Sequence, residues 1–121
     1  MSETHVQRER ILLGGLLRDN AQLSRIQLAA SDFQVRPHGQ IFEAISRAVA
    51  QKLVADPMTI ADRLDEETGQ RGWLKLVIEC FDACLAPDNT AHHASKIRDD
   101  AIARRAAEIG MRLAERSGDP R

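Results

Sequence analysis

The sequence contains few of the residues from which aromatic binding surfaces and disulfide frameworks are built. It has no tyrosine, three phenylalanines, one tryptophan and two cysteines in 121 residues. Proteins that bind single-stranded nucleic acid by stacking need exposed aromatic side chains, and small disulfide-bonded folds need several cysteine pairs. Both classes are disfavoured. The four aromatic residues are Phe33, Phe42, Trp73 and Phe81. Three of these four lie in apolar helical patterns or beside a cap, which favours the core over an exposed stacking role.

The chain also lacks a dominant charge and any long apolar run. Its 17 basic and 18 acidic residues give a formal net charge of −1, which indicates no general affinity for nucleic acid. The apolar runs are too short to span a bilayer, and no basic-then-apolar leader precedes Glu9. We therefore expect a cytoplasmic protein that contacts neither a membrane nor DNA directly.

No catalytic or cofactor-binding motif is present. The sequence has no Gly-x-x-x-x-Gly-Lys-[Ser/Thr] phosphate loop, so it is not expected to hydrolyse ATP as a helicase motor does. Cys80 and Cys84, with His92 and His93 across a short turn, do not have the usual Cys₂His₂ zinc spacing. His38 has no obvious carboxylate constellation. We expect no catalytic residue, no cofactor and no metal ligand, and two reduced, buried thiols.

The apolar pattern is helical throughout, because no stretch alternates with a period of two and β-branched residues are sparse. At this length the chain forms one domain. Pro37 suits the first turn of a helix, and Asp56 before Pro57 repeats that start signal. Asn20 is predicted to cap a short helix that continues to Leu28. The expected inner positions are Ile41, Phe42, Ile45, Ala48 and Val49 in the first of these helices, and Met58, Ala61 and Leu64 in the next.

The predicted fold class is all-α: a compact four-helix head over about residues 5–68, followed by an antiparallel helical hairpin over about residues 73–116. Pro87 ends the first hairpin helix, and the polar residues after it can cap the second. A short connection between two helices makes them antiparallel neighbours. Residues 117–121 are expected to be a linker or a tail.

Two adjacent glycines, Gly14 and Gly15, lie in the middle of the first predicted helix, which runs from about Val6 to Arg18. Two glycines cost a helix roughly 2 kcal/mol relative to alanine, so an ordinary core helix is not expected to contain them. Because glycine has no Cβ, another backbone can approach it closely. The pair predicts such an approach on this helix.

Several segments taken together resemble a known family. They are residues 9–20 with the glycine pair, Ser31-Asp32-Phe33, residues 36–45 beginning Arg-Pro-His-Gly-Gln-Ile-Phe, and residues 56–64 beginning Asp-Pro-Met-Thr-Ile. In this order and spacing the sequence resembles the N-terminal domain of DnaB-type bacterial replicative DNA helicases, over about Arg8 to Glu115. The chain departs from the family pattern at Arg71-Gly72-Trp73, where Gly-Gly and an aromatic residue are frequent, and at His93, where a tyrosine is frequent.

The resemblance implies that residues 1–121 form one non-catalytic domain, the ATPase motor being a separate domain in the family. Such domains pair through a helical hairpin, form a collar of three dimers and recruit primase. The implied partners are therefore a second copy of the chain, primase and the helicase motor domain, with a helicase loader as a further candidate. Two alternatives stay open: the helicase-interaction domain of a primase, against which a start directly after Met1 argues, and a free-standing adaptor or inhibitor of the replisome.

The helix predicted over residues 73–86 is apolar around most of its circumference. Its charged residues Lys75, Glu79 and Asp82 fall within an arc of roughly 60°, which leaves an apolar arc about twice as wide as that of an ordinary surface helix. Either the head covers the excess or a second copy does. The predicted dimer interface consists of Leu74, Leu76, Val77, Ile78, Cys80, Phe81 and Leu85.

Arginines recur along the last predicted helix beside an apolar stripe of Ile102, Ala106, Ile109 and Leu113. Their spacing of seven residues and then four places them within one arc of roughly 40°. They form either a solvated charged face or a docking stripe for an acidic partner such as another replication protein. The docking hypothesis names Arg98, Arg105, Arg112 and Arg116.

Overall fold

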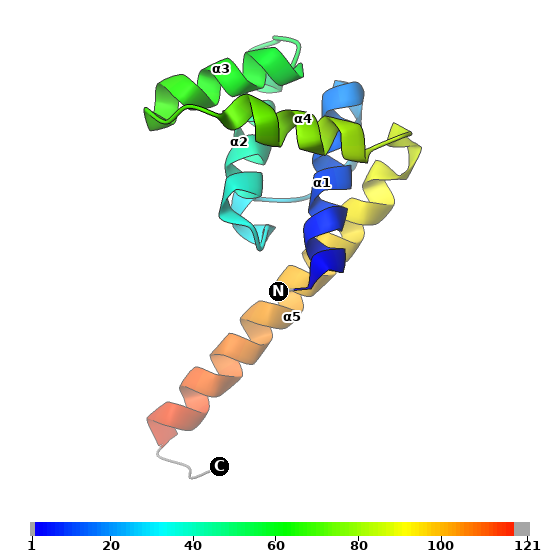
Figure 1. The fold of residues 1–121 in the computed structure, drawn as a ribbon. Helices are drawn as coiled ribbons and strands as arrows, with labels where there is room; N and C mark the ends of the chain where they lie inside the picture. Colours follow the sequence, from blue (N-terminus) through cyan, green and yellow to red (C-terminus); the bar gives the residue numbers. More distant parts are fainter. Residues whose placement is uncertain (1, 118–121) are drawn as a thin grey trace.

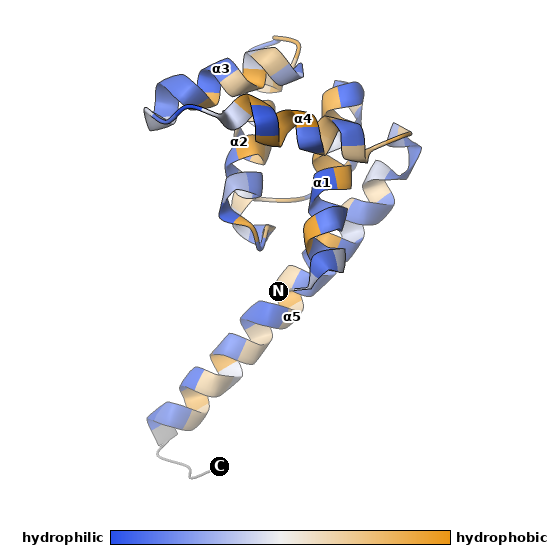
Figure 2. Ribbon diagram, in the orientation of Figure 1, coloured by the Kyte–Doolittle hydropathy of each residue, from blue (hydrophilic) through white to orange (hydrophobic). Residues whose placement is uncertain are grey.

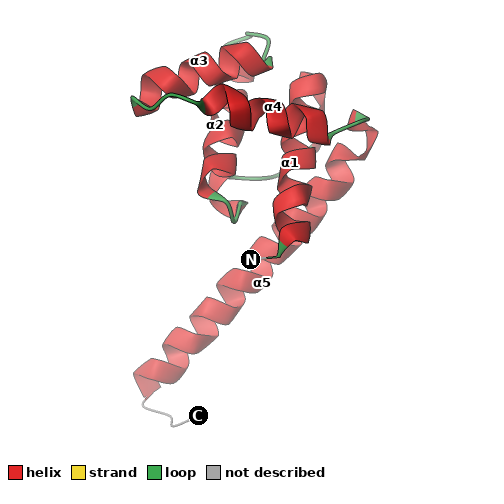
Figure 3. Ribbon diagram, viewed as in Figure 1, coloured by secondary structure: helices red, strands yellow, loops and turns green. Residues whose placement is uncertain are grey.

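The computed structural model describes residues 2–117, and this part of the chain contains only helices, turns and loops (Figure 3). The predicted all-α fold class is confirmed. Five α-helices are joined by four connections, and two of these contain 3₁₀-helix: two turns in the first connection and one in the last. The α-helices are α1 (Glu3–Arg18), α2 (Arg36–Ala50), α3 (Pro57–Thr68), α4 (Trp73–Ala83) and α5 (Thr90–Ser117), and the 3₁₀ turns are η1 (Asn20–Arg25), η2 (Ala30–Asp32) and η3 (Pro87–Asn89).

Helix α1 is the centre of the molecule. Helices α2, α4 and α5 all pack against it, and α3 closes the head by packing against α2 and α4 (Figure 1). The buried faces of these helices form one apolar core. Its largest fully buried aliphatic side chains are Leu12, Leu13, Leu16, Ile41, Ile45, Ile60, Leu64 and Val77.

The glycine pair lies where two other elements cross α1. A Cβ on Gly14 would overlap the carbonyl oxygen of Cys80 and lie 2.7 Å from the Cβ of Cys84. A Cβ on Gly15 would overlap the side-chain oxygen of Thr90, the first residue of α5. The predicted close approach is therefore confirmed, and it brings both α4 and the start of α5 onto α1.

The helix start signals predict α2 and α3 correctly, but the prediction for the segment after α1 is wrong. Pro37 lies in the first turn of α2, and the Asp56 carboxylate accepts a 2.8 Å hydrogen bond from the Thr59 N–H at the start of α3. Asn20 does not cap a helix reaching Leu28. Asp19 caps the short turn η1 instead, because the Asn20 amide is used elsewhere: it bonds the carbonyl of Leu16, at 2.8 Å, and both backbone groups of Ala55.

The inner faces of α2 and α3 largely match the predicted sets. Ile41, Phe42, Ile45 and Ala48 are buried, while Val49 is only partly buried. In α3, Ala61 and Leu64 are buried as expected, but Met58 is 56% exposed and Ile60 is buried instead. Ile60 lies about 200° around the helix from Met58, so a core face that includes Ile60 turns Met58 toward solvent.

Helices α4 and α5 follow each other through a short turn, but they do not lie along one another. Helix α4 packs across α1 and α3 and belongs to the head, whereas α5 packs against α1. The α5 residues Thr90, His93 and Asp100 meet α1 residues in reverse order along the chain. The antiparallel neighbour of α5 is therefore α1, because the glycine pair lets α4 and α5 dock at the same point of that helix.

Beyond its contacts with α1, helix α5 leaves the head and projects as a single helix (Figure 1). Of the predicted linker or tail at 117–121, residues 118–121 lie outside the described residues. Within the described chain, no helix combines the length and the apolar content needed to cross a membrane.

Candidate protein-interaction surface

Part of the predicted interface on α4 is buried within the single chain. Val77 and Cys80 are fully buried against the head, so their assignment to an interface is corrected: they have no surface to offer a partner. Leu74, Leu76 and Phe81 are partly buried against the same core. Of the seven predicted residues, the two that are largely free are Ile78 and Leu85, with 41% and 92% of their surface exposed.

Arg18 explains why Phe81 is unavailable. The guanidinium of Arg18 lies 3.9 Å from the centre of the Phe81 ring, and its Nε and Nη2 donate hydrogen bonds of 3.1 and 3.0 Å to the Phe81 carbonyl. A cation at the carbonyl end of a helix is favourable, and stacking on the ring adds to it. The outer edge of α4 carries the partly buried Leu74 and the exposed Ile78, and Leu85 follows in the turn after the helix, while the Cys80 edge meets the head.

The projecting half of α5 carries a second apolar surface. Ala94, Ile97 and Ala101 on its first half are buried, but after Ala101 the apolar side chains face solvent as far as Leu113. Figure 2 shows apolar positions continuing into this free half. Soluble monomers rarely leave a continuous apolar surface of this kind uncovered. The large side chains on it are Ile102, Ile109 and Leu113, each at least half exposed.

The predicted arginine stripe is divided between two roles. Arg98 donates a 3.4 Å hydrogen bond to the Gln27 carbonyl, and Arg105 forms a 2.6 Å ion pair with Asp32. These two arginines therefore contact the head, although both side chains remain exposed, and the docking hypothesis for the four arginines stays a prediction. Arg112 and Arg116 lie on the projecting half and form no ion pair with any residue between 2 and 117.

Cys80 and Cys84 are free, buried cysteines that lie against Gly14. Desolvation raises the pKa of Cys80 to about 12 and also raises the pKa of Cys84. His93 faces Arg8 rather than the thiols, at 3.1 Å. Within residues 2–117 no histidine, cysteine and carboxylate side chains are grouped as a metal site would require, and the thiols act as small apolar core residues.

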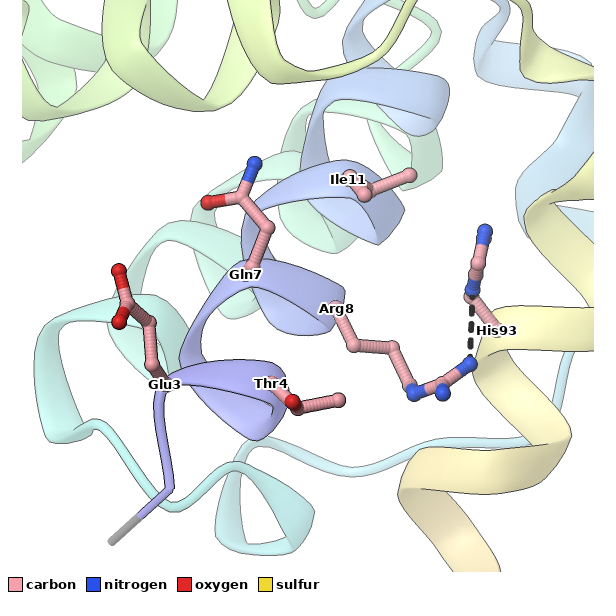
Figure 4. Close-up of a pocket in the computed structure, with 6 residues that line it drawn as sticks. All are labelled: Glu3, Thr4, Gln7, Arg8, Ile11 and His93. Atoms are coloured by element: carbon pink, nitrogen blue, oxygen red, sulfur yellow. Dashed lines mark hydrogen bonds between the residues drawn. The ribbon is translucent and has the colours of Figure 1, made fainter.

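A shallow groove lies between the start of α1 and α5 (Figure 4). Arg8 can only donate hydrogen bonds, so Nδ1 of His93 must accept the bond between them and the ring is neutral. Burial, with the Arg8 charge, lowers the pKa of His93 in agreement with this. The lining has mixed chemistry and forms no nucleophile–base set: Glu3, Thr4, Gln7, Arg8, Ile11 and His93.

Sequence reasoning missed a buried carboxylate–imidazole pair. Glu9 is almost fully buried, and its carboxylate accepts hydrogen bonds from the Gln34 N–H at 2.7 Å, the Val35 N–H at 3.3 Å and Nδ1 of His38 at 2.9 Å. The spacing contained a usable signal, because Glu9 lies three and four residues before the buried Leu12 and Leu13 and so shares their face of α1. The pair fixes the segment that leads into α2 to helix α1. No nucleophilic side chain among the described residues forms part of it.

Comparison with known proteins agrees with this architecture. The family model described as the DnaB-like helicase N-terminal domain matches residues 1–99. The N-terminal domain of DnaB helicase from Mycobacterium tuberculosis superposes with a TM-score of 0.85 at 24% identity, covering 91% of this chain and 81% of that one.

The corresponding domain from Helicobacter pylori, described together with its interactions with primase, superposes with a TM-score of 0.83 at 21% identity. That alignment covers 98% of this chain and 99% of the neighbour. At these identities the neighbours establish the fold, and the family model establishes membership. This chain belongs to the family of DnaB-like helicase N-terminal domains.

Proposed function

We propose that this chain is the non-catalytic domain through which a replicative DNA helicase assembles and docks other replication proteins. The observation that carries the proposal is the projecting half of α5, whose apolar stripe faces solvent beyond the head. A helix that buries no face gains little stability from packing. Covering this stripe with a second protein surface removes its apolar side chains from water, which is the main favourable term in association.

A second copy of the chain is the first partner we propose. A collar of three dimers needs two different contact surfaces on each chain, one for the two-fold pair and one to join the pairs. The chain has two separate exposed apolar surfaces: the projecting stripe of α5 and the outer edge of α4. We assign the pair to Ile102, Ile109 and Leu113, and the joining contact to Leu74, Ile78 and Leu85.

Primase is the second partner we propose, with the helicase motor domain and a helicase loader as further candidates. The structure from H. pylori supports this indirectly, since that domain is described with its interactions with primase. In this chain Arg112 and Arg116, beside the apolar stripe, supply positive charge that no described carboxylate neutralises in an ion pair. Such charge favours an acidic partner and fixes its orientation.

The assembly is tested by placing a charge on each surface and measuring solution mass by sedimentation and light scattering. Wild type should form dimers at micromolar concentration, with larger multiples as concentration rises. Ile109→Asp should give monomers, because a buried unpaired charge is strongly unfavourable, whereas Ile78→Asp should leave dimers and remove the larger species. Both variants should keep wild-type helicity.

Met111→Asp is the matched control, since Met111 is exposed like Ile109 but lies about 200° around the helix from it. It should leave the dimer intact. A wild-type chain that stays monomeric at high concentration, or a dimer unaffected by Ile109→Asp, would show that α5 does not mediate self-association.

A further inference from the structure

The junction between α5 and the head combines a small apolar contact with a set of polar ones. The apolar part consists of Ala94, Ile97 and Ala101, two of which have only a methyl side chain. Past Ala101, no apolar side chain of α5 is buried as far as Arg116. The last contacts that hold the helix before it projects are therefore polar.

These polar contacts converge on the segment that carries Asp32. Nη2 of Arg105 donates to Oδ1 of Asp32 at 2.6 Å and to the Ser31 hydroxyl at 3.3 Å. Nη2 of the neighbouring Arg104 donates to the Asp32 backbone carbonyl at 3.2 Å. One turn before Arg104 on α5, Nε2 of His5 lies 3.1 Å from the Asp100 carboxylate.

Asp32 is not an ordinary surface carboxylate. Its side chain is only 3% exposed, whereas that of Arg105 is 47% exposed. Oδ2 is occupied by the Ala29 N–H at 2.8 Å, and Arg105 is its ion-pair partner among residues 2–117. Removing the partner of a buried charge is far more costly than breaking an exposed ion pair.

The segment around Asp32 is itself held in place. The buried Glu9 carboxylate binds the backbone N–H groups of Gln34 and Val35, so the next residues are fixed to α1. A side chain that pairs with Asp32 is therefore anchored to the rigid head and not to a free loop.

We propose that Asp32, Arg104 and Arg105 form an ionic latch that sets the angle between α5 and the head. With the latch formed, α5 holds one direction; with it open, α5 pivots about the small contact at Ala94, Ile97 and Ala101. The twelve residues that follow Arg105, up to Ser117, extend α5 by about 18 Å, so a small rotation at the junction moves the projecting surface by several ångströms. The latch concerns one chain and does not depend on which partner covers α5.

The test measures the distance between nitroxide labels on Ala50→Cys, at the exposed end of α2, and Glu115→Cys, on the projecting half of α5. The native cysteines are buried and stay unlabelled under mild conditions. Labelled chains are mixed with a tenfold excess of unlabelled chain, so that only distances within one chain are recorded. Wild type at low salt should give one narrow distance distribution.

Arg105→Gln should make this distance distribution about twice as wide or move its mean. The double variant Arg104→Gln/Arg105→Gln should change the distribution more than the single variant does. Wild type at 1 M salt should move only part of the way toward the variants, because the screening length falls to about 3 Å there but the Asp32 carboxylate is buried. Arg112→Gln is the matched control, with the same change of charge two turns further along α5, and should behave as wild type.

The proposal is overturned if the distribution is equally narrow in wild type and in the double variant, or if wild type is already broad at low salt. Because Arg105→Gln leaves the buried Asp32 carboxylate without its ion-pair partner, circular dichroism and thermal unfolding are used to check that each variant is folded at the temperature of the distance measurement. Solution mass is measured on the same samples. A dimer that persists while the angle changes separates this proposal from the proposed self-association.

Discussion

Lys52 has a backbone conformation that suits glycine better than lysine. Its φ is 62°, within the left-handed region, and it follows the last residues of α2, where Leu53 N–H bonds the Ala48 carbonyl at 2.9 Å. This is the helix-ending arrangement in which glycine is usual, because it has no Cβ to clash.

Lys52→Gly should therefore stabilise the chain by about 1 kcal/mol. The measurement is the free energy of unfolding in urea. Lys52→Ala keeps the Cβ and should give no gain, so equal stabilisation by both substitutions would assign the effect to loss of the lysine charge instead.

At the same scale, the Cys80 thiol should make the free energy of unfolding depend on pH. Burial raises the pKa of its thiol to about 12 in the folded chain, whereas an unfolded cysteine ionises near pH 8.5. Above that pH the unfolded state loses the proton first, so the stability due to the neutral thiol is fully present below about pH 8.5 and is lost as the pH rises toward 12. The free energy of unfolding should fall between pH 9 and about 10.5, and fall less steeply in Cys80→Ala; parallel slopes would show that the thiol does not contribute.

At the scale of the helix, the glycine pair determines how three elements meet. Gly14 lies under the Cys80 carbonyl of α4, and Gly15 lies under Thr90 at the start of α5. Because the obstacle at Gly14 is partly backbone, it cannot be relieved by rotating a side chain.

Gly14→Ala should destabilise the chain by about 3 kcal/mol through overpacking. Gly110 supplies the control, since it lies in α5 and an added methyl group would meet none of the described residues there. At that position the same substitution should stabilise the helix by about 1 kcal/mol. Thermal unfolding of the two variants gives the comparison, and a harmless Gly14→Ala would mean that α4 can shift away from α1.

The elements that could be predicted are those encoded by local sequence. The starts of α2 and α3 follow from proline and a capping aspartate. The glycine pair indicates that another element crosses α1, because the helix stability lost to two glycines needs a compensating contact. The sequence could not show which helix makes that contact. Spacing shows that α4 is apolar around most of its surface, but whether Val77 or Ile78 faces the head depends on where α4 crosses α1.

The candidate surface was harder to predict for a related reason. Seven-residue spacing places Arg98, Arg105, Arg112 and Arg116 on one face, and it contains no information about where the head ends along that face. The head reaches as far as Arg105 through Asp32. The same helix face is therefore an internal contact in its first half and an exposed surface in its second.

At the scale of the whole molecule, α5 extends out of a head that is otherwise closed. The part that projects carries charge and apolar surface together, in Arg112 and Arg116 beside Ile109 and Leu113. We expect recognition of primase to depend on this end of the molecule.

Arg112→Glu/Arg116→Glu should weaken primase binding about tenfold with little change in melting temperature, because exposed charges contribute about 0 to 1 kcal/mol each to stability. Titration calorimetry with primase measures the affinity. Lys75→Glu, an exposed charge reversal on α4, is the control and should bind as wild type. Equal affinities for all three chains would place primase recognition elsewhere.

The central place of α1 also has a consequence for biosynthesis. Helix α1 leaves the ribosome before the other four helices, and its partners on α4 and α5 lie about 65 to 85 residues later in the chain. Chains grow at about 5–20 residues per second, so Leu12, Leu13 and Leu16 wait several seconds before their neighbours are available. Contacts of such long sequence separation are unusual among small helical proteins and slow their folding. During that interval the apolar face of α1 is the part of the nascent chain that most needs protection from aggregation.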